Sequence, residues 1–270
     1  MPSASTMARS VYDHGCRVLH PVIDSFVPVT YTGIECRERI RRLDPTGARS
    51  ESRSNHHTDA RIIELGAKLG VDEATVERYL TEARSVRLAD VSPNEAAHLA
   101  SPMCHEDRYT TYVITRIARP ELAIETGIAH GISSAYVLAA MEAGNRGRLI
   151  SIELDHDPHI GGHVPAGLRS RWNTCWGNSL QLLPDLVALQ GPLDLFLHDS
   201  DHNYRHVWRE FEIVWPHIRP GSLLCAHDVL HNNAFPRFVR KHRASIDAWA
   251  SSINFGVIRK SGGESHHADR

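Results

Sequence analysis

The stretch LDLFLHDSDHNY, residues 193–204, decides the predicted fold. Its first half is apolar, and its second half is a run of carboxylates, imidazoles and hydroxyls. A buried parallel strand has this pattern, because it ends in polar residues that enter a crevice at its carboxyl end. Ligands bind in that crevice in open α/β sheets. The stretch SLLCAHDV, residues 222–229, likewise runs from apolar residues into His227 and Asp228. The two strands predict one shared polar site.

Strands and helices alternate on both sides of this stretch. Apolar runs predict strands at 122–126, 148–154, 172–176, 193–198, 222–229 and 253–258. Helical spacing predicts helices at 132–142, 179–189, 204–218 and 234–250. Repeated strand and helix alternation predicts a doubly wound, mainly parallel α/β sheet.

The N-terminal part predicts a helical appendage. Residues 41–59 are polar, charged and turn-rich, which favours a linker. Apolar residues recur at helical spacing from Ala60, Gly70 ends that helix, and Asp72 caps a second one. A third helix is expected over 93–118. We divide the chain into a poorly defined segment at 1–59, a helical cap at 60–118 and an α/β catalytic domain at 119–270.

Composition restricts the partners. The 270 residues are 41% hydrophobic, which is enough for a full core, and the net charge is −2. That balance predicts no general attraction to nucleic acid or to an anionic membrane, and the second appendage helix carries as many acids as bases, unlike a DNA-reading helix. No apolar run has membrane-spanning length, and the N-terminus lacks a signal-peptide core. Five scattered cysteines favour a reducing cytoplasm.

The first strand leads into ETGIAHGISS, residues 125–134. Gly127 permits a tight turn, and Gly131 permits a close approach at the start of the next helix. The third glycine of a dinucleotide fingerprint is missing. The spacing instead resembles motif I of the Rossmann-like methyltransferases that use S-adenosylmethionine.

Further motifs follow in the order that this resemblance requires. Glu153 ends the second strand, where a carboxylate accepts ribose hydroxyls, and GNS at 177–179 follows the third. With GHVP at 162–165, LRSRW at 168–172 and WPHIRPG at 215–221, residues 88–260 resemble the type 24 small-molecule methyltransferases. The resemblance implies a cofactor, S-adenosylmethionine, held by Glu125, Gly127, Gly131, Ser133, Glu153, Asn178, Ser179 and Asp199. It also implies two C-terminal antiparallel strands. Only 253–258 is apparent, so we expect the sheet to be one strand short, with its edge covered by the N-terminal segment or a partner subunit.

The catechol O-methyltransferase branch of this superfamily suggests a role for the polar strand ends. By position, the resemblance makes Asp199, His227 and Asp228 the metal ligands and His202 the general base. A mixed nitrogen and oxygen set favours Mn, Fe or Zn over Mg. Imidazole ordinarily titrates near neutral pH, which suits removal of a hydroxyl proton before methyl transfer. Base catalysis without metal stays open, with Asp199 fixing the cofactor or capping a helix.

Two other classes of function stay open. One is a non-methylating metal enzyme such as an oxygenase, cyclase or hydrolase, since His202, His227 and Asp228 converge. The other is a cofactor-binding regulatory protein that works through its N-terminal helices. We expect His198 and His206 to be structural. The acceptor is expected to be a hydroxylated small molecule from secondary metabolism, the chain is expected to form a homodimer, and the acceptor atom stays open between oxygen, nitrogen and carbon.

Overall fold

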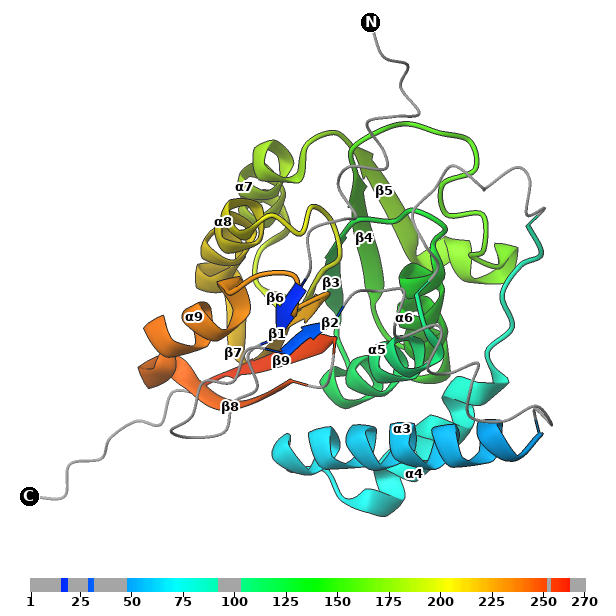
Figure 1. Cartoon of the computed structure of the whole chain (residues 1–270). Coiled ribbons are helices and arrows are strands. Elements are labelled where there is room, and N and C mark those ends of the chain that lie inside the picture. Colours follow the sequence, from blue (N-terminus) through cyan, green and yellow to red (C-terminus); the bar gives the residue numbers. More distant parts are fainter. Residues whose placement is uncertain (1–15, 19–28, 32–47, 92–102, 252–253, 263–270) are drawn as a thin grey trace, which may run out of the picture. The chain divides into compact units, whose positions relative to one another are not determined.

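A computed structural model describes residues 16–18, 29–31, 48–91, 103–251 and 254–262. The chain forms two compact units, Met1–Thr58 and Asp59–Arg270. In the first unit, β1 (Cys16–Val18) pairs antiparallel with β2 (Val29–Tyr31). The larger unit contains a seven-stranded sheet and the helices that connect its strands (Figure 1). Before the sheet in sequence it also contains two helices and the C-terminal half of a third. It therefore places the predicted cap and the predicted catalytic domain in one compact body.

The sheet is mainly parallel and has the order β5-β4-β3-β6-β7-β9-β8. Only β9 runs against its neighbours β7 and β8. The strands are β3 (Leu122–Thr126), β4 (Arg148–Glu153), β5 (Trp172–Trp176), β6 (Leu193–His198), β7 (Ile218–His227), β8 (Ile246–Ser251) and β9 (Phe255–Lys260). The predicted doubly wound α/β fold is confirmed.

The chain reverses its direction of travel across the sheet between β3 and β6. From β3 it moves outward through β4 to β5, and it then returns to place β6 on the other side of β3. Such a switch point opens a crevice at the carboxyl ends of the strands. The polar ends of β3 and β6 lie side by side there, and Asp199 N donates to Thr126 O at 2.8 Å.

Helices cover both faces of the sheet because alternate strand residues point to opposite sides. Leu122 and Ile124 pack with α7 (Ser179–Gln190), α8 (Tyr204–Val214) and α9 (Ala234–Lys241). Ala123 packs on the other face with α3 (Ala48–Lys68), α5 (His105–Ala118) and α6 (Ile132–Ala143). The result is a three-layer arrangement, with helices on both faces of the sheet (Figure 1).

The N-terminal helices differ from the prediction at one boundary. The expected linker at 41–59 is wrong from residue 48 onward, because α3 begins at Ala48; residues 41–47 lie outside the described ranges. A polar run without glycine or proline can continue a helix whose later turns are buried, as those of α3 are at Ile62 and Leu65. Asp72 caps α4 (Glu73–Ser85) as predicted, accepting from Thr75 N at 2.9 Å. Residues 93–102 of the third predicted helix are not described.

The C-terminal end corrects the prediction of a missing strand. Residues 234–250 are not one helix: α9 ends at Lys241, and β8 follows at Ile246–Ser251. Ile246 and Ala250 are buried while Asp247 and Trp249 are exposed, which is the two-residue period of a strand. β8 pairs antiparallel with β9, so the sheet is complete. Likewise, α8 stops at Val214, and β7 begins at Ile218 rather than residue 222.

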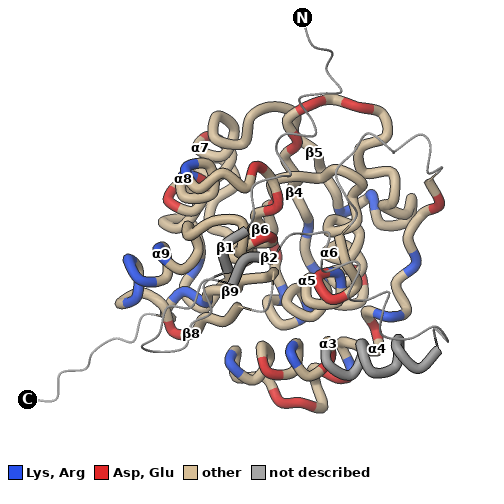
Figure 2. The backbone as a smooth tube through the Cα atoms, in the orientation of Figure 1, with Lys and Arg blue, Asp and Glu red and all other residues tan. Residues whose placement is uncertain are grey.

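Charge is concentrated on the exposed side of α9. Its apolar side chains Phe235 and Phe238 are buried, while Arg237, Arg240 and Lys241 are exposed. Figure 2 shows basic positions in blue along α9. This is an amphipathic surface helix packed on the sheet. None of the helices in the described part of the chain combines the length and apolar character that a bilayer crossing requires.

Candidate active site

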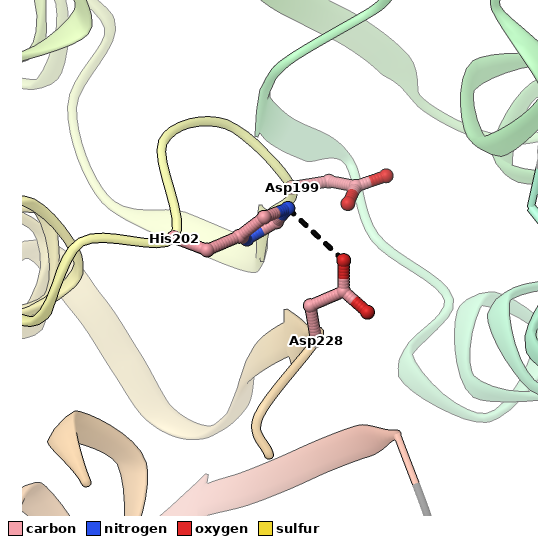
Figure 3. Close-up of side chains that lie close together, drawn as sticks. All are labelled: Asp199, His202 and Asp228. Atoms are coloured by element: carbon pink, nitrogen blue, oxygen red, sulfur yellow. Dashed lines mark ion pairs between the residues drawn. The ribbon is translucent and has the colours of Figure 1, made fainter. Parts of the chain in front are cut away.

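Three side chains from two strand ends meet at the crevice. Asp199 and His202 follow β6, Asp228 follows β7, and one ligand-type atom of each lies within 4.8 Å of the others. His202 Nε2 lies 3.0 Å from Asp228 Oδ2 (Figure 3). These side chains are partly exposed, at 20% for Asp199, 28% for His202 and 19% for Asp228. The group is therefore open to a ligand.

Asp228 is held in an unusual backbone conformation. Its φ of 55° lies in the left-handed region, which is costly for a residue with a side chain. Asn254 Nδ2 donates to its Oδ1 at 2.6 Å. Burial raises the pKa of this carboxyl, but the hydrogen bond from His202 and the positive field of His227 lower it well below its usual range. Asp228 is thus a carboxylate aimed into the group.

His227 is placed differently from the other expected metal ligands. Its Nδ1 donates to Asp199 Oδ1 at 2.8 Å, and its Nε2 donates to Asp107 Oδ2 at 3.0 Å. Burial opposes the charge on this imidazole, but the carboxylates of Asp199 and Asp107 raise its pKa to about 11. Both ring nitrogens of His227 are therefore occupied by protein carboxylates. The imidazole that lies with Asp199 and Asp228 in the candidate metal group is that of His202.

The two glycines of the first turn approach different neighbours. Gly127 has a φ of 86°, and a Cβ there would stand 2.1 Å from the carbonyl oxygen of Asp199. Gly131 has a φ of 77°, and its Cβ would stand 2.6 Å from Gly161 Cα. Gly127 thus lets the turn pack against the loop that carries Asp199 and His202.

Glu153 organises the same turn from the end of β4. Its Oε2 accepts from the backbone amides of Ile128 and Ala129 at 2.9 and 3.0 Å, and its Oε1 accepts from Leu154 N at 2.7 Å. The amides after Gly127 are therefore directed at a carboxylate of the protein. Glu153 is part-exposed at the strand end that the sequence predicted for it.

Glu125 and Ser133 lie beneath the turn, away from the crevice. Glu125 is fully buried and accepts from the hydroxyls of Ser133, Ser134 and Ser151 at 2.5 to 2.7 Å. Burial raises its pKa to about 7 against the opposing effect of these hydroxyls. The two residues support the turn from inside the protein.

Asn178 and Ser179 begin α7. Asn178 caps the helix by accepting from Leu180 N at 2.9 Å. Ser179 is buried and donates to Glu210 on α8. His206 also bonds to Glu210, as does His198, in keeping with the structural roles expected for both histidines.

Sequence reasoning missed three residues of this region: Asp107, Asn254 and Glu210. Asp107 is buried on α5 and reaches the site from outside the α/β alternation, so no local pattern marks it. The sequence did contain a signal for Glu210, because it lies on the same helix face as Val207 and Val214. A carboxylate on a buried apolar face is rare unless it is paired or hydrogen-bonded.

Comparison with protein-family models matches residues 124–229 to a methyltransferase domain. The matched range starts in β3 and ends just after β7, so it contains Gly127, Glu153, Asp199 and Asp228. Residues 124–229 are thus similar to a methyltransferase domain, and the rest of the chain lies outside this match. The resemblance drawn from the sequence motifs is confirmed for this part of the chain.

The methyltransferase domain also has individual relatives. Demethylmacrocin O-methyltransferase of Streptomyces fradiae is 38% identical over 47 residues, which are 17% of this chain and only 12% of that enzyme. An O-methyltransferase from Bacillus cereus, solved in complex with SAH, covers 69% of this chain and 91% of its own, at 18% identity and a TM-score of 0.47. The MycE methyltransferase from the mycinamycin biosynthetic pathway, solved with Mg and SAH, covers 52% and 45%, at 17% identity and a TM-score of 0.42.

Proposed function

We propose that this chain transfers a methyl group from S-adenosylmethionine to a hydroxyl group of a small molecule, assisted by a divalent cation. The observation that carries the proposal is the packing of two features against each other. The glycine turn of the methyltransferase domain meets the loop of Asp199 and His202 so closely that a Cβ at Gly127 would clash with Asp199 O. A cofactor at the turn and a substrate at the carboxylates would thus be neighbours, as methyl transfer requires.

The residues around the turn fit an adenosyl cofactor. Gly127 brings the turn against the loop that carries Asp199, and Glu153 ends β4 where a ribose would lie. We propose that Gly127, Glu153, Asn178 and Asp199 line the cofactor site. Gly131 and the buried residues Glu125, Ser133 and Ser179 would support it from behind. When bound, S-adenosylmethionine supplies an electrophilic methyl group on a sulfonium.

The donor set also fits a divalent cation. Asp199 and Asp228 present hard oxygen donors, which suit Mg²⁺ or Mn²⁺. We propose these two carboxylates as the protein ligands and His227 as the residue that fixes Asp199, since both of its nitrogens are engaged. A bound cation would lower the pKa of a substrate hydroxyl and orient it.

His202 is the proposed proton acceptor. Its Nε2 faces Asp228 at 3.0 Å, and the partly exposed ring leaves room for a substrate hydroxyl. The His202 imidazole takes the hydroxyl proton as the oxygen attacks the methyl carbon, whose bond to the sulfonium sulfur breaks, and the Asp228 carboxylate stabilises the resulting imidazolium. Positioned base catalysis of this kind contributes about 10²- to 10⁴-fold in rate.

The geometry gives less support to a metal-centred oxygenase. The described side chains that gather are one imidazole and two carboxylates, whereas the common oxygenase triad has two imidazoles and one carboxylate. We further propose a secondary metabolite as acceptor, in line with the curated relative that methylates demethylmacrocin. We also propose a reducing cytoplasm, which the free thiols at Cys104, Cys175 and Cys225 support. The homodimer stays a proposal.

The proposal is tested with methyl-labelled S-adenosylmethionine and a panel of hydroxylated natural products. We expect label on a product oxygen, with the rate reduced about 10²- to 10⁴-fold by His202→Gln. Asp228→Asn and a chelator should each suppress the reaction, and added Mg²⁺ should restore only the chelated wild type. Full activity of Asp228→Asn in chelator would contradict the cation, and label on nitrogen or carbon would contradict O-methylation.

A further inference from the structure

Asn232 joins the two loops that carry the candidate active site. It lies in the loop between β7 and α9, four residues after Asp228, and its side chain is part-buried. Its Nδ2 donates to the backbone carbonyl oxygen of His202 at 2.7 Å, and its Oδ1 accepts from Ala234 N at 2.7 Å. One side-chain amide therefore bonds both to the loop after β6 and to the start of α9.

These two hydrogen bonds fix the orientation of the amide. A backbone carbonyl only accepts and a backbone N–H only donates, so the nitrogen of Asn232 faces His202 and its oxygen faces Ala234. The neighbouring Asn233 is exposed and makes no side-chain bond that caps α9. The oxygen of Asn232 thus has an ordinary role at the start of a helix, whereas its nitrogen reaches a loop 30 residues away in sequence.

The bond to His202 acts on the part of the loop that bears the proposed base. The loop is fixed where it begins, because Asp199 N donates to Thr126 O at 2.8 Å, and it ends where α8 begins at Tyr204. Between these two points, Asn232 holds the backbone of His202 from the neighbouring loop. A side chain moves with its backbone, so this bond restricts where the imidazole can lie.

The same bond keeps His202 close to Asp228. His202 Nε2 lies 3.0 Å from Asp228 Oδ2, and the two residues come from different loops (Figure 3). Asp228 shares its loop with Asn232, so a hydrogen bond from Asn232 to the other loop holds the pair together. Misplacement of a reacting group by about 1 Å can cost about 100-fold in rate. The bond therefore matters more for a reaction at this site than its own strength suggests.

We propose that Asn232 is a positioning residue that holds the imidazole of His202 beside Asp228 by donating to the His202 carbonyl oxygen. The inference rests on the proposed function for its consequence in catalysis, since His202 is the proton acceptor there. The hydrogen bond itself belongs to the folded chain, and its effect on the loop can be measured without cofactor, metal or substrate.

The test separates the two ends of the amide. Asn232→Asp keeps an acceptor for Ala234 N and loses the donor to His202. Asn232→Ser does the same without adding a charge, because a serine oxygen can accept from the backbone amide two residues on. Asn233→Ser is the matched control, since it changes the exposed neighbour that makes no side-chain bond to the helix start.

Hydrogen exchange, followed by mass spectrometry on the full chain without ligands, reads out the loop. We expect exchange to become faster in residues 199–204 of both Asn232 variants and to stay unchanged in residues 234–241, where the acceptor for Ala234 N is kept. The Asn233→Ser control should exchange as the wild type does in both stretches. Unchanged exchange of residues 199–204 in both Asn232 variants would overturn the inference, because the bond would then not hold the loop.

Turnover gives a second readout that a general loosening of the chain would not reproduce. We expect both Asn232 variants to lower kcat about 10- to 100-fold with KM nearly unchanged, and circular dichroism to show that they are folded. In a His202→Gln background the same changes should have little further effect on kcat, because residues that act through one another are not additive. An equal loss in that background would also overturn the inference.

The two readouts distinguish this inference from the proposed function. Absence of methyl transfer by the wild type would count against the proposed function alone, because the exchange measurement depends on neither cofactor nor substrate. Methyl transfer by the wild type together with full kcat in both Asn232 variants would count against the role of Asn232 alone.

Discussion

Two buried carboxylates lie under the candidate site on opposite faces of β3, and they differ in protonation. Glu125 faces α6, where it accepts only from serine hydroxyls, and its pKa is raised to about 7 by burial. Its neighbour Thr126 points to the other face and donates to Glu210. Burial alone would raise the pKa of Glu210, but the hydrogen bonds from its donors lower it. Hydroxyls alone do not compensate for burying a charge, whereas two added imidazoles do.

The difference indicates a division of labour. Beneath the glycine turn, Glu125 has its pKa raised to about 7, so it keeps its proton in a large fraction of molecules near neutral pH and acts as a hydrogen-bonded support. Beneath the site loop, Glu210 is a fixed negative charge with a fixed direction of hydrogen bonding. Near His202, the hydrogen bonds to Glu210 all run from a donor to one ionised acceptor, and we call these bonds the oriented network. Their five donors are Thr126, Ser179, His198, Ser200 and His206. Beneath the glycine turn, Glu125 is bonded to hydroxyls alone.

Removal of Glu210 should have the largest effect. Glu210→Ala leaves five donors without their acceptor, so we expect a loss of about 3–5 kcal/mol in the free energy of unfolding, measured with urea. Glu212→Ala on the same helix is the control, because that acid is part-exposed and pairs with Lys241 at the surface. Equal losses in the two variants would contradict the oriented network.

Glu125 should make the protein less stable as pH rises, because its pKa is raised in the folded chain, whereas that of Glu210 is lowered. Between pH 4.5 and 7 the folded chain keeps a proton on Glu125 that the unfolded chain has released, so this contribution to stability is lost as pH rises through 7. The shift corresponds to about 3 kcal/mol. We expect the stability of the wild type relative to Glu125→Gln to fall by that order between pH 5 and 7.5. A pH-independent difference between the two proteins would refute the raised pKa.

Gly127 follows Glu125 and Thr126 at the end of β3, and its substitution should show an intermediate effect. Gly127→Ala adds a Cβ where φ is 86° and where Asp199 O stands 2.1 Å away, so we expect a loss of about 1–3 kcal/mol together with weaker cofactor binding. Gly221→Ala is a matched control for backbone strain, since its φ is 82° and its Cβ would meet nothing. The loss of unfolding free energy in Gly127→Ala beyond that in Gly221→Ala measures the cost of the close approach to Asp199 O. Equal losses in the two variants would contradict it.

Removal of a single hydroxyl donor should have the smallest effect on stability, and its size should differ between Glu125 and Glu210. Ser134→Ala removes a donor to Glu125, which is largely protonated at pH 6, and should cost about 1 kcal/mol. Thr126→Val removes a donor to ionised Glu210 and should cost about 2 kcal/mol. Thermal or urea unfolding of both variants at pH 6 measures the difference. A reversed order would show that Glu210 is not the charged member of the pair.

The sequence predicted the parts of the fold that depend on local patterns. Apolar runs ending in polar residues located the strands of the parallel sheet, and Gly70 and Asp72 marked a real helix boundary. β8 was missed because the stretch that contains it follows a helix directly, without a glycine or proline to mark the change of period. The first turns of α3 were missed because their polar sequence has no apolar stripe.

The candidate site was predictable only in outline. Asp199, His202 and Asp228 follow strands whose order a sequence can suggest, so their convergence was expected. The place of His227 depends on Asp107, 120 residues away on α5, and no local pattern announces such a pairing. Glu210 lies on the same helix face as Val207 and Val214. Its burial could not be predicted without the five donors that reach it from separate elements.

Calorimetric titration with S-adenosylmethionine tests the central claim most directly. We predict micromolar binding to the wild type, abolished by Glu153→Ala and retained in Glu121→Ala, which removes an exposed acid at the opposite end of the strands. Thermal melts establish that both variants are folded. No heat of binding to the folded wild type would contradict the assignment of this site to methyl transfer.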